Sequence, residues 1–80
     1  METFGERLKH ALSLKGSTLG ALALDLDRTG HGVTRSAVGH WSRGRCTPDM
    51  ATINAIADAL GVRAAWLAFG EGKPRARRAA

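Results

Sequence analysis

Hydrogen-bond donors gather on one side of the segment from Thr34 to Arg43. Placed at about 100° per residue on an α-helix, the apolar residues Ala37, Val38 and Trp41 share an arc of about 100°. The opposite side carries Arg35, Ser36, Gly39, His40 and Arg43. None of these residues is acidic, and the central glycine costs the helix about 1 kcal/mol relative to alanine. Such a side is suited to close approach to a ligand rich in hydrogen-bond acceptors.

The positive charge of the chain is unevenly placed. The net charge is +5, and the stretch between Asp27 and Asp49 holds no acid. The arginines of that stretch are Arg28, Arg35, Arg43 and Arg45, and the C-terminal end adds Lys73, Arg75, Arg77 and Arg78. One positive surface is therefore expected, which suits a polyanion such as nucleic acid.

Composition limits the remaining classes of protein. Eighty residues suffice for one small domain, which we place at 1–72, followed by a flexible basic tail at 73–80. A single cysteine, Cys46, excludes an internal disulfide framework, and no apolar run approaches the roughly 18 residues of a membrane span. We expect a cytoplasmic, nucleoid-associated protein with no membrane contact.

Apolar periodicity and capping residues predict an all-α fold of five helices. Thr3 and Glu6 have capping-box spacing before a helix from Phe4 to Lys15. Thr18 can cap a second helix with the inner face Leu22, Ala23 and Leu26, which breaks in the glycine-rich segment 29–32. Thr34 can cap a third helix, which Gly44 closes. No segment predicts a strand.

Two further helices complete the prediction. Pro48 and Asp49 begin the fourth, which ends at Gly61. Its inner stripe is Met50, Ile53, Ile56, Ala57 and Leu60. The fifth is short, from about Arg63 to Phe69, and offers Ala65, Trp66 and Phe69 as its apolar residues. These aromatic side chains can fill the core or pair two subunits.

Three quoted stretches carry a family resemblance: VTRSAVGHWSRGRCTPD, INAIADALGV and WLAFGEG. Together they resemble the Cro/repressor-type helix-turn-helix family, also called lambda-repressor-like or xenobiotic-response-element-like, over roughly 4–71. The resemblance implies a five-helix domain with its helix-turn-helix at helices two and three. It also implies that the third helix, about 34–43, reads the major groove of double-stranded DNA, as in a transcriptional regulator and most plausibly a repressor.

The resemblance assigns roles position by position. The base-contacting positions fall on Arg35, Ser36 and His40, with Gly39 as a further position. The positions that the resemblance gives to the DNA backbone are Thr34, Arg43 and Arg45. We add Thr18, at the start of the second helix, and Arg28, in the longer segment after it, as further expected backbone contacts. Repressor-type domains usually bind near-palindromic operators as homodimers. Pairing through the last helix would involve Trp66 and Phe69.

Departures from the family pattern leave an alternative open. Leu19 stands where the family usually has glutamine, and the chain between Ala23 and Val33 is about five residues longer than the usual turn. Helix two could be extended, or the extra residues could form a loop. The alternative function is a helix-turn-helix protein-interaction module, such as an antitoxin or polymerase-associated factor, that uses the extended 24–32 segment.

Catalytic and metal chemistry find little support in the sequence. The spacing of His10, His31, His40 and Cys46 matches no usual zinc pattern. Asp25 and Asp27 point in different directions on a helix and cannot act as an acid–base pair. We expect no enzyme activity, no metal and no cofactor.

Overall fold

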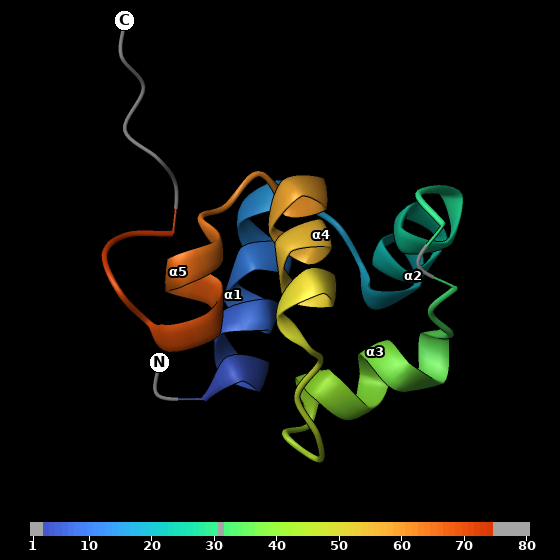
Figure 1. Cartoon of the computed structure of the whole chain (residues 1–80), viewed down its shortest axis with the longest axis horizontal. Coiled ribbons are helices and arrows are strands. Elements are labelled where there is room, and N and C mark those ends of the chain that lie inside the picture. Colours follow the sequence, from blue (N-terminus) through green and yellow to red (C-terminus); the bar gives the residue numbers. More distant parts are fainter. Residues whose placement is uncertain (1–2, 31, 75–80) are drawn as a thin grey trace, which may run out of the picture.

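Five α-helices make up the regular structure in the computed structural model, which describes residues 3–30 and 32–74. They are α1 (Phe4–Lys15), α2 (Leu19–Arg28), α3 (Arg35–Ser42), α4 (Met50–Leu60) and α5 (Ala64–Phe69). Because the described ranges contain no strand, the all-α expectation is confirmed. Helices α1, α4 and α5 pack together on one side of the molecule, and α2 and α3 lie on the other (Figure 1).

Side-chain caps begin the first four helices where the sequence predicted them. Thr3 and Glu6 form the reciprocal capping box of α1. The hydroxyl oxygens of Thr18 and Thr34 each accept a hydrogen bond of 3.1 Å from the backbone N–H three residues on, and Asp49 caps α4 in the same manner at 3.0 Å. Each bond satisfies an amide that the first helical turn leaves without a partner.

Of the two possibilities for the longer chain between α2 and α3, an extended helix or a loop, the structure shows the extended helix. Helix α2 continues to Arg28, so the five residues that follow Ala23 are helical rather than part of a loop. The turn that follows contains Gly30 and Gly32, both with positive φ angles, 85° and 58°. His31 lies outside the described residues.

Every helix contributes to one hydrophobic core. The side chains with no measurable exposure include Leu8 from α1, Leu22 from α2, Val38 from α3, Ile56 from α4 and Leu67 from α5. The predicted inner face of α2, Leu22 with Ala23 and Leu26, is buried as expected. Through its apolar side α3 packs against α1 and α2, which connect it to α4 and α5 in the same core.

Three predicted core positions, Met50, Ala65 and Phe69, are wrong. Met50 is 45% exposed because it is the first residue of α4, where the helix has only just emerged from the preceding loop. In α5 the buried residues are Trp66 and Leu67, while Ala65 and Phe69 are exposed. A helix of six residues has less than two turns, so its periodicity defines no face and tertiary packing decides which side turns inward.

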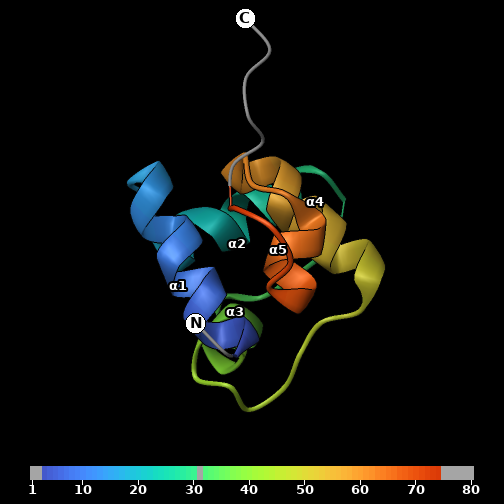
Figure 2. The same ribbon diagram turned by 90° about the vertical axis from the view of Figure 1, so that its left-hand side faces the viewer.

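Helix α1 touches both α3 and α5 at close range (Figure 2). A Cβ atom on Gly5 would lie 2.7 Å from the carbonyl oxygen of Ser42 and 2.8 Å from that of Trp41, so only glycine allows this approach of α1 to the end of α3. Arg7 is 6% exposed, and its guanidinium donates from Nε to the Leu67 oxygen at 2.8 Å and from Nη2 to the Ala68 oxygen at 2.9 Å. Arg7 thus satisfies carbonyls in the last turn of α5.

The C-terminal segment is described only up to Pro74. The Pro74 oxygen accepts a hydrogen bond of 2.7 Å from the backbone N–H of Arg63, which ties this residue to the start of α5. The basic tail expected at 73–80 otherwise lies outside the described residues.

In the part of the chain that the structure describes, no helix is long and apolar enough to cross a bilayer.

Candidate nucleic-acid interface

Helix α3 is anchored on one side and open on the other. Val38 and Trp41 are buried in the core, as the helical arc predicted. Arg35 and Ser36 are exposed on the other side, and His40 is half-buried. Because the apolar side is held by the core, the orientation of the polar side toward solvent is determined by the fold.

The side chain of Arg35 lies across to the start of α2. A Cβ atom on Gly20 would be 3.7 Å from the Nε atom of Arg35, 3.9 Å from its Cζ atom and 4.0 Å from the Thr18 hydroxyl oxygen. Leu19, which stands where the family usually has glutamine, instead packs against the core as a partly buried residue. The polar surface at this end of the helix pair is therefore made by Arg35 from α3 and Thr18 from α2.

Gly39 is buried rather than open to solvent, and its cover is a side chain of its own helix. A Cβ atom on Gly39 would lie 3.4 Å from both terminal nitrogens of Arg43 and 3.7 Å from Cζ. The sequence placed Gly39 on the outer side of the helix, where the guanidinium of Arg43 now covers it. Arg43 itself is exposed.

Ser42, the last residue of α3, is buried as well. It is 5% exposed, and its hydroxyl donates a hydrogen bond of 2.8 Å to the Gly39 oxygen. The approach of α1 at Gly5 covers this end of α3. Helical position alone could not reveal this burial, because the covering element comes from a distant part of the sequence.

The capping threonines keep a donor for a ligand. The oxygens of Thr18 and Thr34 accept backbone hydrogen bonds, but the O–H group of each hydroxyl is not used in those bonds. Both residues are exposed at helix N-termini, where the helix dipole favours an anion. Arg45 is exposed in the turn after α3 and adds positive charge.

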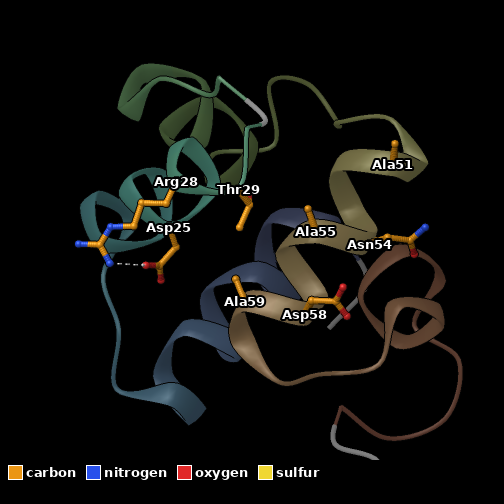
Figure 3. Close-up of a pocket in the computed structure, with 8 residues that line it drawn as sticks. All are labelled: Asp25, Arg28, Thr29, Ala51, Asn54, Ala55, Asp58 and Ala59. Atoms are coloured by element: carbon orange, nitrogen blue, oxygen red, sulfur yellow. Dashed lines mark ion pairs between the residues drawn. The ribbon is translucent and has the colours of Figure 1, made fainter.

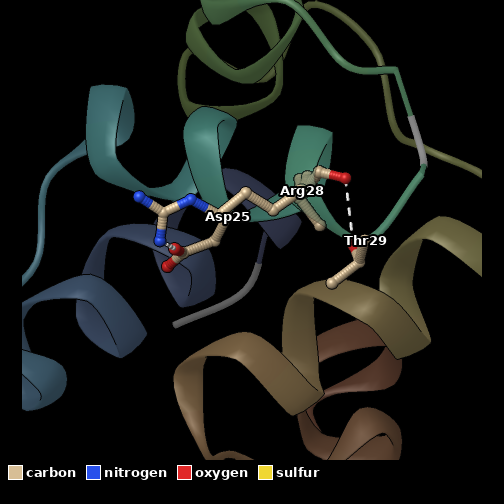
Figure 4. A network of polar contacts seen from close by, with 4 residues as sticks. Asp25, Arg28 and Thr29 are labelled. Carbon is tan, nitrogen blue, oxygen red and sulfur yellow. Dashed lines mark hydrogen bonds and ion pairs between the residues drawn. The ribbon is translucent and has the colours of Figure 1, made fainter.

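Arg28 lies apart from the α3 surface. Its Nη1 atom is 3.9 Å from a carboxylate oxygen of Asp25, and the two residues line a groove between α2 and α4 (Figure 3). Thr29, the next residue, donates from its hydroxyl to the Leu26 oxygen at 2.9 Å (Figure 4). The other residues lining the groove are Ala51, Asn54, Ala55, Asp58 and Ala59. The guanidinium of Arg28 thus lies beside an acidic residue of its own helix.

The aromatic residues of α5 separate into two environments. Trp66 is 6% exposed and its ring centroid lies 5.9 Å from that of His10, so it belongs to the core and is not available to a second subunit. Phe69 is 64% exposed, which contradicts a core role and leaves it as the exposed residue of the predicted pair.

Cys46 is an exposed free thiol. Among the described residues, no three His, Cys, Asp or Glu side chains are grouped to hold a metal ion.

A five-helix domain in which α3 presents arginine side chains beside the capped start of α2 has the architecture of a small helix-turn-helix domain. In agreement, the chain is similar to two helix-turn-helix (HTH)-type transcriptional regulators: that for conjugative element SXT from Vibrio cholerae and that for conjugative element pMERPH from Shewanella putrefaciens. Each is 38% identical to it over 73 residues, which are 91% of this chain.

The chain spans only 31% of the length of each of these relatives. No family model matches the chain, and no solved structure matches it either. Because the matched proteins are named as transcriptional regulators, the similarity does not favour the alternative of a protein-interaction module. The similarity also does not show whether the chain is a Cro/repressor-type domain, so this assignment stays a prediction.

Proposed function

We propose that this chain binds double-stranded DNA at specific sequences and thereby regulates transcription, as a Cro/repressor-type domain acting as a repressor. The observation that carries the proposal is the acid-free outer side of α3, with Arg35 held beside the capped start of α2. The major groove of B-DNA accepts one α-helix and displays the acceptors that such a surface requires. The similarity to named HTH-type regulators supports the same reading.

The exposed residues of the first turn of α3 are assigned to base edges. Arg35 would donate two hydrogen bonds to the O6 and N7 atoms of a guanine, the contact for which its fork is suited. Ser36 and His40 would add contacts on the same side. Gly39, the further base-contacting position, is covered by the guanidinium of Arg43, so it would contribute to close approach only with that side chain turned toward the groove.

A second group of residues would hold phosphates and fix the position of the helix in the groove. Thr18 and Thr34 would donate their hydroxyl hydrogens, and Arg45 would add charge from the turn after α3. These contacts would raise affinity for every duplex. Arg28 belongs to the same expected group and would turn to a phosphate from Asp25, with which it forms a 3.9 Å pair between exposed side chains.

Binding as a homodimer to a near-palindromic operator is part of the same proposal. Two copies of α3 would then enter successive major grooves about 34 Å apart. Phe69 is the exposed aromatic residue of α5 and would take part in the pairing. The proposed place of action is the cytoplasm, on the nucleoid.

Selection of bound duplexes from a random pool tests the function most directly. A conserved motif made of two half-sites is expected, with a spacing near one helical turn. The selected duplex and a scrambled one would then be compared by fluorescence anisotropy over a range of salt concentrations. Recovery of no motif, with equal affinity for both duplexes at moderate salt, would overturn the proposal.

A further inference from the structure

The guanidinium of Arg43 lies over Gly39, whereas the sequence resemblance gave this residue a contact with the DNA backbone. Arg43 follows the last residue of α3, a position expected to reach the DNA backbone. Its side chain instead runs back along the helix, so that both terminal nitrogens lie 3.4 Å from where a Cβ atom of Gly39 would be. Helical side chains lean toward the N-terminus, so the charged end of Arg43 lies about one turn before its own Cα atom.

Resting on the proposed function, we propose that Arg43 reads a base edge together with Arg35, and that Gly39 makes room for it. Residues 35, 39 and 43 succeed one another at intervals of four and share one side of α3. The guanidinium of Arg43 therefore lies on the side that carries Arg35, and not in the turn that carries Arg45. Since the two arginines are eight residues apart, the rise between them is about 12 Å.

The guanidinium of Arg43 is free to be used in this way. In the described ranges of the chain, no carboxylate forms an ion pair with Arg43. The backbone N–H of Arg43 is bonded to the Gly39 oxygen at 3.1 Å, and the Ser42 hydroxyl donates to the same oxygen. The backbone at this end of α3 is thus fixed, while the side-chain donors of Arg43 retain their capacity for a ligand. A small rotation would turn the fork from Gly39 to the O6 and N7 atoms of a guanine.

The substitution Arg43→Lys separates a base contact from a phosphate contact. Lysine keeps the charge and serves well beside a phosphate, but it lacks the planar fork that matches guanine. We expect Arg43→Lys to lower the preference at one base pair of the selected duplex by about tenfold, measured on a panel of duplexes substituted at each position. The salt dependence of binding should stay unchanged because the charge is kept.

The matched control is Arg45→Lys, which should leave the preference at every base pair as it is. A second variant, Gly39→Leu, should remove the same preference as Arg43→Lys, because the three atoms nearest to a Cβ at that position all belong to the guanidinium of Arg43. Combining Gly39→Leu with Arg43→Lys should then add little. Circular dichroism would confirm that each variant is folded.

Two different failures can be told apart. If the unmodified chain prefers one duplex but Arg43→Lys keeps the full preference at every position, Arg43 is a phosphate contact and the inference is wrong. If the unmodified chain has no preference among duplexes, it is the proposed function that fails.

Discussion

Arg7 and Arg43 each lie 3.4 Å from where a Cβ atom of a glycine would be, and the fold uses the two side chains in opposite ways. Arg7 is buried with one terminal nitrogen 3.4 Å from where a Cβ of Gly70 would be, and it donates to two carbonyl oxygens of α5. Arg43 makes a similar contact with Gly39 but is exposed, and the hydrogen bonds of this region use its backbone only. The donors of one arginine are consumed by the fold, and those of the other remain available.

The difference follows from what surrounds each guanidinium. Carbonyls in the last turn of a helix need donors, and Arg7 lies between α1 and α5 where water has little access. Arg43 is exposed, and its guanidinium lies against Gly39. A position beside a glycine therefore does not by itself show how an arginine is used, because burial and nearby acceptors decide whether the fold occupies its donors.

The largest effect should come from Arg7→Ala. The change removes two charge-assisted hydrogen bonds and leaves the Leu67 and Ala68 oxygens without these donors, at a cost of about 3 to 4 kcal/mol in the free energy of unfolding. In a domain of this size that corresponds to a fall of roughly 15 °C or more in Tm. Thermal unfolding followed by circular dichroism measures it. Arg63→Ala, at an exposed arginine, is the control and should change Tm little.

A second substitution tests the glycines rather than the arginines. Gly5→Ala would place a Cβ atom 2.7 Å from a backbone oxygen of α3, and backbone cannot move aside as a side chain can. We expect the unfolding free energy to fall by about 2 to 3 kcal/mol in urea titrations, despite the better helix propensity of alanine. Gly20→Ala, whose Cβ would meet nothing closer than 3.7 Å, should instead be neutral or stabilising by up to about 1 kcal/mol. Equal effects of the two changes would show that the contact at Gly5 is not constraining.

These contacts also show which parts of the fold could be predicted from the sequence. The start of α1 at Phe4 depends on Thr3 and Glu6, and its end depends on Gly16. Each of these residues is close in sequence to the helix end that it determines. Such signals are local, so the helix bounds followed from residue type and spacing. The apolar arc of α3 succeeded for the same reason, since Val38 and Trp41 are buried wherever the helix packs.

Contacts between distant segments could not be predicted in the same way. Gly5 lies 37 positions before Ser42 in the sequence, and neither residue type indicates that the two segments are in contact. The burial of Gly39 depends on the direction taken by one flexible side chain. For the site, the exposed positions Arg35 and Ser36 followed from periodicity, whereas the separation of Arg28 from them depends on the extension of α2 and on Asp25.

Arg35→Ala tests an arginine that, like Arg43, is exposed and keeps its donors available for a ligand. Because Arg35 is exposed and its guanidinium lies against Gly20 without burial, its loss should leave the unfolding free energy within about 0.5 kcal/mol. Binding to the selected duplex should weaken by about 1 to 3 kcal/mol, and the preference at one base pair should relax. Competition between matched and scrambled duplexes measures both. An equal loss on the two duplexes would show that Arg35 holds a phosphate instead.

The smallest effect is expected for Arg45→Ala, which distinguishes exposure from base recognition. Arg45 is exposed, like Arg43, but it lies in the turn after α3, and its backbone N–H is bonded to the His40 oxygen at 3.0 Å. A phosphate contact from this position should weaken all duplexes alike, a few-fold, and reduce the slope of log affinity against log salt by about 1. Anisotropy titrations on matched and scrambled duplexes give this slope. A selective loss on the matched duplex would mean that the reading surface extends into the turn, and that exposure without an acceptor is by itself enough to make an arginine of this protein a base contact.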